Sequence, residues 1–141
     1  MNKSTGEAQM VHVALRNLVG RGVQAAVEVP LLHRSIDLVF RDGHDYVAVE
    51  FKVKDWKRAF EQARDHLIAA DQVYVCIPSA RVSEAVIATA EEYGVGLMSF
   101  EADEPLRVVV SAHRPKYVWR KAQAWLANAF ASRLPTVGTS E

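Results

Sequence analysis

Two neighbouring stretches, residues 35–41 and 46–54, alternate apolar and polar side chains, and this pattern limits the possible folds more than any other. Successive side chains of a strand point to opposite faces of a sheet, so each stretch predicts a half-buried strand. The turn-rich sequence Asp42-Gly43-His44-Asp45 joins the two strands into a hairpin. If Arg41 faces Tyr46, one face of the hairpin is an apolar layer of Ile36, Leu38, Phe40, Val47, Val49, Phe51 and Val53.

The opposite face of the predicted hairpin carries charged side chains. In this register Asp37 faces Glu50, and Lys52 points the same way two residues later. Like charges paired across strands repel, and a hard divalent cation such as Mg²⁺ or Mn²⁺ would neutralise them. Lys52 would then be close enough to orient water or offset phosphate charge. The alternative is a surface face on which the two acids pair with Lys52, Lys54 and Arg34.

The apolar periodicity elsewhere predicts the remaining elements. Helices are expected at residues 6–19, 55–70, 83–93 and 115–130, and strands at 23–29, 72–77, 95–100 and 106–110. Pro30 should close the first strand, Asp55 should cap the second helix, and Pro115 should open the last. The order α-β-β-β-α-β-α-β-β-α predicts one α/β domain over residues 1–134, with a mixed sheet flanked by helices and a disordered tail at 135–141.

Composition narrows the class of protein. No apolar run approaches the roughly 20 residues of a membrane span, and the first residues lack the apolar core of a signal peptide. Cys76 is the only cysteine and lies in a predicted buried strand, which suits a reducing cytoplasm. The 17 basic and 17 acidic residues cancel, but a local basic face can still bind nucleic acid.

Asp37, followed on the next strand by Glu50-Phe51-Lys52, after a helix and a first strand, resembles the PD-(D/E)xK nuclease superfamily. The pattern is similar to archaeal Holliday-junction resolvases and small restriction-endonuclease-like proteins, over about half of the chain. Ile36 stands where the name-giving proline would be. The resemblance implies an α-β-β-β-α-β core with C-terminal additions, and hydrolysis of phosphodiester bonds that depends on Mg²⁺ or Mn²⁺.

The resemblance also assigns roles to single residues. Asp37 and Glu50 would be metal ligands, and Lys52 would position or activate water. Glu7, on the inner stripe of the first helix, would complete the metal site; alternatively Ser4 and Glu7 form a capping box. Gln62 would lie near the metal or the scissile phosphate, although the residues themselves favour a solvated helix edge for both Gln62 and His66. From their position rather than from the resemblance, His33 and Arg34, just before the strand of Asp37, are expected to contact the nucleic acid, and so is Lys54; as loop residues His33 and Arg34 could equally make no contact.

The predicted last helix allows two interpretations. Its basic and aromatic residues suit contacts to nucleic acid: Lys116, Tyr117, Trp119, Arg120, Lys121 and Trp125. An amphipathic stripe in the same segment favours packing on the sheet or against a second subunit: Val118, Ala122, Trp125, Leu126, Ala129 and Phe130.

The sequence thus predicts a nuclease that selects DNA structure rather than sequence and works as a homodimer. The alternatives are a nuclease-fold module that binds nucleic acid without cleaving it, and an enzyme that acts on RNA.

Overall fold

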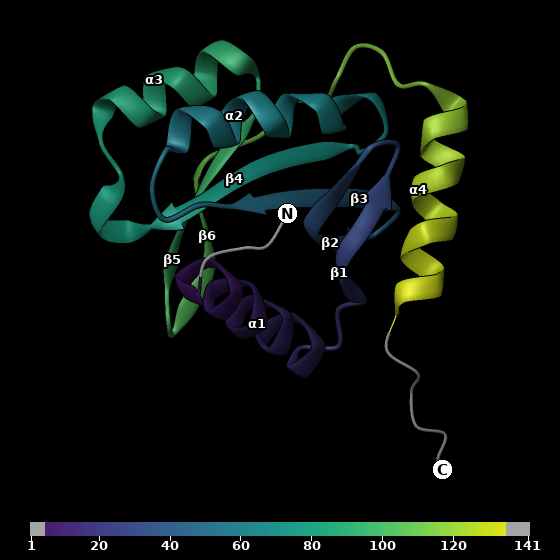
Figure 1. The fold of residues 1–141 in the computed structure, drawn as a ribbon, viewed down its shortest axis with the longest axis horizontal. Coiled ribbons are helices and arrows are strands. Elements are labelled where there is room, and N and C mark those ends of the chain that lie inside the picture. Colours follow the sequence, from purple (N-terminus) through teal and green to yellow (C-terminus); the bar gives the residue numbers. More distant parts are fainter. Residues whose placement is uncertain (1–4, 135–141) are drawn as a thin grey trace.

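The computed structural model describes residues 5–134 as a six-stranded mixed sheet with helices on both faces (Figure 1). The strands lie side by side in sequence order: β1 (Ala25–Leu31), β2 (Arg34–Asp42), β3 (Asp45–Phe51), β4 (Gln72–Pro78), β5 (Gly96–Glu101) and β6 (Glu104–Val110). The helices are α1 (Thr5–Gly20), α2 (Trp56–Arg64), α3 (Glu84–Tyr93) and α4 (Arg120–Arg133), with 3₁₀ turns η1 (Asp65–Ile68) and η2 (Ser79–Arg81). This order confirms the predicted α/β class.

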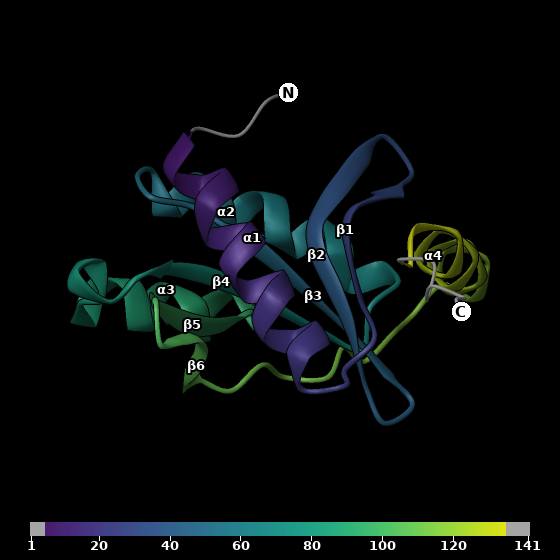
Figure 2. The ribbon, with the colours of Figure 1, turned by 90° about the horizontal axis from the view of Figure 1, so that it is seen from below.

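The sheet separates two apolar clusters. One lies beneath α2, α3 and α4 and includes Phe60, Val75 and Phe130; the other lies against α1 and includes Leu18, Leu38 and Phe51. Figure 2 shows α1 crossing one face of the sheet while α4 lies beside β1 at its edge. Strands β3, β4 and β5 are parallel because α2 and α3 connect them, and the other neighbours are antiparallel. No helix within residues 5–134 is long and apolar enough to cross a membrane.

The hairpin of β2 and β3 has the predicted register. Arg41 pairs with Tyr46 and Leu38 pairs with Val49, so each pair sums to the same index. The strands extend further into the loop than expected, to Asp42 and Asp45, and Gly43 turns the chain with φ 62°. The shorter turn adds one residue to the end of β2 and one to the start of β3. The pairs further from the turn therefore keep the same register.

The predicted apolar layer is interrupted at Ile36, which contradicts the expectation of one unbroken face. Val27 and Leu38 are paired and pack towards α1, whereas the next pair along, Val29 and Ile36, packs in the opposite cluster. Between these pairs lies Glu28, whose φ of 50° is left-handed and rare for a residue with a side chain. The irregular backbone at Glu28 accompanies a change of face, and Asp37 lies opposite that point.

Two predicted strand ends are wrong, and the predicted start of α2 is right although Asp55 does not cap it with its side chain. Strand β1 continues through Pro30 to Leu31, which an edge strand permits because the missing N–H faces no partner. Asp55 precedes α2 but is left-handed (φ 54°), and its side chain makes no capping hydrogen bond. Strand β3 ends at Phe51 rather than Lys54.

The last helix begins at Arg120, five residues after the predicted start at Pro115. The backbone N–H of Trp119 donates to the carbonyl of Ile68 at 2.8 Å, and Trp119 is extended with ψ 115°. This contact to η1 holds the preceding segment out of the helix. The predicted tail at 135–141 and the Ser4 partner of the capping box lie outside the described residues.

Candidate nuclease site

Three buried carboxylates converge on the segment where β3 ends. Glu7 comes from the first turn of α1, Asp37 from the middle of β2 and Glu50 from β3. Their exposed fractions are only 7%, 8% and 5%. Burial of an ionised carboxylate is costly unless hydrogen-bond donors or cations compensate it, so each of these groups requires a partner.

Each carboxylate accepts a hydrogen bond from within the protein. The backbone N–H of Phe51 donates to Asp37 Oδ2 at 2.8 Å, and the N–H of Val53 donates to Glu7 Oε2 at 3.0 Å. His66 Nε2 lies 2.8 Å from Glu50 Oε2. The inward orientation expected for Glu7 is confirmed, and its carboxylate ties α1 to the chain just after β3.

His66 is the residue whose importance sequence reasoning missed. It is only 2% exposed, which contradicts the expectation of a solvated helix edge. The predicted helix tightens into the 3₁₀ turn η1 at Asp65, and the imidazole faces inward against Glu50. A signal was present: Ala59, Ala63, His66 and Ala70 follow helical spacing, and all four are buried.

Lys52 and Lys54 follow Glu50 but differ in their surroundings. The Lys52 N–H donates to the Cys76 carbonyl at 3.0 Å, so the backbone still pairs with β4 there, and its side chain is half-buried. Lys54 lies in a bend beyond the strand and is exposed, so strand alternation does not place it beside Lys52. The backbone at Lys52 is therefore held against β4, whereas Lys54 lies beyond the strand.

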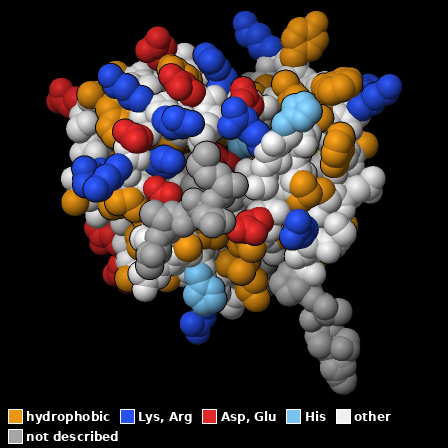
Figure 3. All heavy atoms as spheres, in the orientation of Figure 1, with side chains coloured by type: hydrophobic (Ala, Val, Ile, Leu, Met, Phe, Trp, Pro, Cys, Tyr) orange, Lys and Arg blue, Asp and Glu red, His pale blue; other side chains and the backbone are white. Residues whose placement is uncertain are grey.

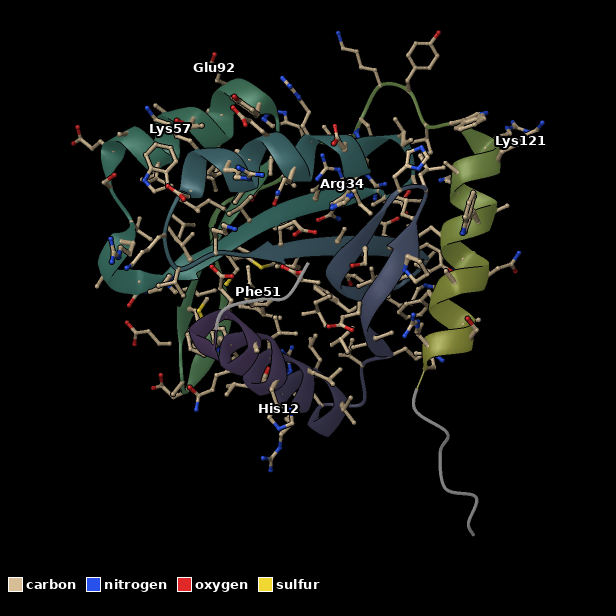
Figure 4. The ribbon with its side chains drawn as sticks, in the orientation of Figure 1. His12, Arg34, Phe51, Lys57, Glu92 and Lys121 are labelled. Atoms are coloured by element: carbon tan, nitrogen blue, oxygen red, sulfur yellow. The ribbon has the colours of Figure 1, made fainter. Side chains whose placement is uncertain are left out.

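The other predicted site residues lie around this centre. Gln62 is half-buried on α2, and its side chain makes no hydrogen bond to another described residue. His33 and Arg34 are exposed where β1 turns into β2. Arg34 Nε lies 3.1 Å from Asp65 Oδ2, so this turn reaches η1 next to His66 (Figure 4).

A groove of about 230 Å³ opens beside Asp37 between α1 and the β1–β2 hairpin. Its wall on α1 is mostly apolar, and its lining on β1 includes the irregular residue Glu28. The residues that line it are Ala8, Val11, His12, Leu15, Val27, Glu28 and Asp37. The groove connects solvent with one carboxylate of the cluster.

The residue types of this cluster suit a hard divalent cation. Mg²⁺ prefers oxygen ligands and often takes only one or two carboxylates, with water and phosphate completing its shell. Asp37 and Glu50 offer such oxygens from adjacent strands. Within residues 5–134, however, no group of three or more His, Cys, Asp or Glu side chains is arranged to hold a metal ion. The oxygen atoms of these side chains therefore suit Mg²⁺, but the side chains do not form a complete set of ligands.

The mixed sheet flanked by helices is a restriction-endonuclease-like fold, as its similarity to solved structures shows. The endonuclease Ecl18kI, solved metal-depleted with uncleaved, modified DNA, superposes with TM-score 0.54 at 12% identity, over 96% of this chain and 48% of Ecl18kI. An XisH family protein from Nostoc punctiforme gives TM-score 0.53 at 13% identity, over 76% of this chain and 98% of that one.

A protein of unknown function from Silicibacter pomeroyi gives TM-score 0.66 at 17% identity, over 94% of this chain and 87% of that one. No protein-family model and no curated protein sequence matches the chain. At these identities the similarity establishes the fold alone.

Proposed function

We propose that the protein is a divalent-metal-dependent nuclease that hydrolyses DNA phosphodiester bonds. One observation carries the proposal: Asp37 and Glu50 are buried on adjacent strands of a restriction-endonuclease-like sheet, and Lys52 follows Glu50 by two residues. Two buried carboxylates this close in the sheet cost stability unless donors or cations compensate their charge, and a bound divalent cation would add to the hydrogen bonds that each already has.

Each residue has a stated part in this proposal. Asp37 and Glu50 would hold Mg²⁺ or Mn²⁺, which supplies charge stabilisation and lowers the pKa of bound water. His66 would orient Glu50 through the 2.8 Å contact. Lys52 would stabilise negative charge that develops on the phosphate. Glu7 would complete the metal site from α1; its Oε2 accepts from the Val53 N–H, and Asp37 and Glu50 likewise have hydrogen-bond partners.

Substrate selection is proposed to depend on DNA structure. The described chain offers a groove beside Asp37 and exposed cations at Arg34 and Lys54, which suit phosphate contacts rather than reading of base edges. Gln62 and His33 could add contacts near the scissile phosphate. Binding should weaken steeply with salt because phosphate contacts release counterions.

A cleavage panel tests the proposal. Linear duplex, flapped, four-way and single-stranded DNA, with RNA of the same sequence, are incubated with Mg²⁺, Mn²⁺ or EDTA. Asp37→Asn and Glu50→Gln should each abolish cleavage, whereas Asp103→Asn, which removes one carboxylate at the β5–β6 turn, should cleave normally. Metal-independent cleavage, or activity retained by both site variants, would refute the proposed centre.

A second function is a module of this fold that binds nucleic acid without cleaving it. It is favoured by one observation: protein groups already hydrogen-bond to all three carboxylates. Calorimetric titration with Mn²⁺ separates the two functions. Binding heat that disappears in Asp37→Asn supports the nuclease, and heat that is absent from the unmutated protein supports the binding module.

A further inference from the structure

The charge of this neutral chain is distributed unevenly. Residues 111–134 contain five Lys or Arg (Arg114, Lys116, Arg120, Lys121 and Arg133) and no Asp or Glu. The remainder therefore has 12 basic residues, which is 17 minus 5, against all 17 acidic ones. Such asymmetry indicates a local partner of negative charge.

Much of this charge lies beside exposed aromatic rings. Tyr117 is 86% exposed, Trp119 54% and Trp125 49%. Figure 3 shows apolar and basic side chains together over the start of α4, where Figure 4 labels Lys121. We name this surface the aromatic-basic face and define it by Lys116, Tyr117, Trp119, Arg120, Lys121 and Trp125.

The aromatic-basic face is not needed for packing of the domain. The opposite side of α4 is buried, through Ala122, Leu126, Ala129 and Phe130, and packs beside β1. Lys121 and Trp125 lie one helical turn apart on the exposed side. Within residues 5–134, Arg114 pairs with Asp45 and Asp71, whereas Lys116, Arg120 and Lys121 have no acidic partner.

The face is attached to the turn that contacts the proposed site. The Trp119 N–H donates to Ile68 O at 2.8 Å, and Ile68 and His66 both belong to η1. His66 in turn contacts Glu50. A ligand bound along α4 would therefore lie on a surface that is fixed relative to Glu50.

We propose that the aromatic-basic face binds a single-stranded DNA segment, with bases stacked on Trp119, Trp125 and Tyr117 and phosphates near Lys116, Arg120 and Lys121. Stacking on aromatic side chains inside a basic groove is the common mode of single-strand binding. A second copy of the chain fits less well, because symmetric pairing would bring the cations of both copies together.

This inference rests on the proposed nuclease function and specifies its substrate as DNA with a single-stranded arm. The test measures binding in EDTA, so the outcome does not depend on cleavage. A fluorescein-labelled 20-nucleotide oligodeoxythymidine is titrated with protein, and fluorescence anisotropy gives Kd. Asp103→Asn, at the β5–β6 turn, should bind as the unmutated protein does, and because no metal-dependent cleavage occurs in EDTA, failure of this face is distinguished from failure of catalysis.

Variants of the aromatic residues give the decisive comparison. Trp119→Ala and Trp125→Ala should each weaken binding at least about five-fold, which corresponds to about 1 kcal/mol. Trp119→Phe keeps a ring and should bind within about two-fold. Trp56→Phe removes the tryptophan of α2, so the remaining fluorescence comes from the face and should be quenched by the oligonucleotide.

Charge variants provide a matched control on one helix. Lys121→Ala should weaken binding and reduce its salt dependence, whereas Arg133→Ala, about 20 Å along α4, should change neither. Unchanged affinity in both alanine variants of the tryptophans would overturn the proposal. So would a dimer, seen in sedimentation equilibrium, that Trp119→Ala dissociates without any change in oligonucleotide affinity.

Discussion

Substitution of His66 by alanine should destabilise the protein through two effects that the structure allows us to estimate. The imidazole is 98% buried, and its loss leaves a cavity where η1 packs against the sheet. Truncation of a large buried side chain to alanine costs about 2–4 kcal/mol. Glu50 Oε2 also loses its 2.8 Å partner, and a hydrogen bond to a charged group contributes about 1.5–3 kcal/mol.

Because the cavity can partly collapse, we expect a total loss of about 3–5 kcal/mol. For a chain of this length that corresponds to a decrease in Tm of about 10–15 °C. Urea unfolding followed by circular dichroism measures the loss directly, provided that the m-value stays constant. His66→Gln keeps a side-chain donor and should lose less than half as much.

A double-mutant cycle isolates the contact itself. If Glu50 and His66 stabilise each other, the double variant that carries both Glu50→Ala and His66→Ala should lose less unfolding free energy than the two single variants together. The difference should be about 1.5 kcal/mol or more. A coupling below about 0.5 kcal/mol would refute the reasoning, because the two side chains would then be independent despite their geometry. In that case His66 would be a packing residue and not one that positions Glu50.

Four further outcomes are expected. Lys52→Ala should lower the cleavage rate at least ten-fold and leave DNA affinity within about two-fold, with Lys57→Ala on α2 as control; an equal loss in affinity with no loss in rate would make Lys52 a phosphate contact. Burial raises the pKa of the Cys76 thiol, so the stability that this group contributes is complete below about pH 8.5 and is lost as pH rises. The free energy of unfolding should therefore fall above that pH by up to about 1.4 kcal/mol per unit more in the unmutated protein than in Cys76→Ala, and parallel curves in urea titrations would contradict this. Gly96→Ala should cost about 1–3 kcal/mol, because a Cβ there would overlap the Tyr74 ring and lie 2.8 Å from the Ala112 nitrogen, whereas Gly20→Ala has open space and should cost far less. Light scattering at micromolar protein tests the homodimer predicted from the sequence. The apolar stripe of α4 is already buried against the chain's own sheet, and a strict monomer would contradict that prediction.

The sequence was enough to predict those strands and helices that depend on residues close together in the chain. Alternation of apolar residues in β2 and β3 set the pairing of Arg41 with Tyr46 and brought Asp37 and Glu50 to neighbouring strands. The Ser83 side chain caps the start of α3. The left-handed backbone of Gly94 ends the helix. The fold class followed from the order of these elements.

The contacts that define the site depended on residues far apart in the chain. Helical spacing placed His66 on the buried side, but its partner Glu50 lies 16 positions earlier on another element. The start of α4 is delayed because the Trp119 N–H donates to the Ile68 carbonyl, 51 positions earlier. Ile36 left its predicted face because Glu28, on the neighbouring strand, takes a left-handed backbone. Periodicity reports which side of an element is apolar, whereas the partner of a buried polar group is decided by packing between elements.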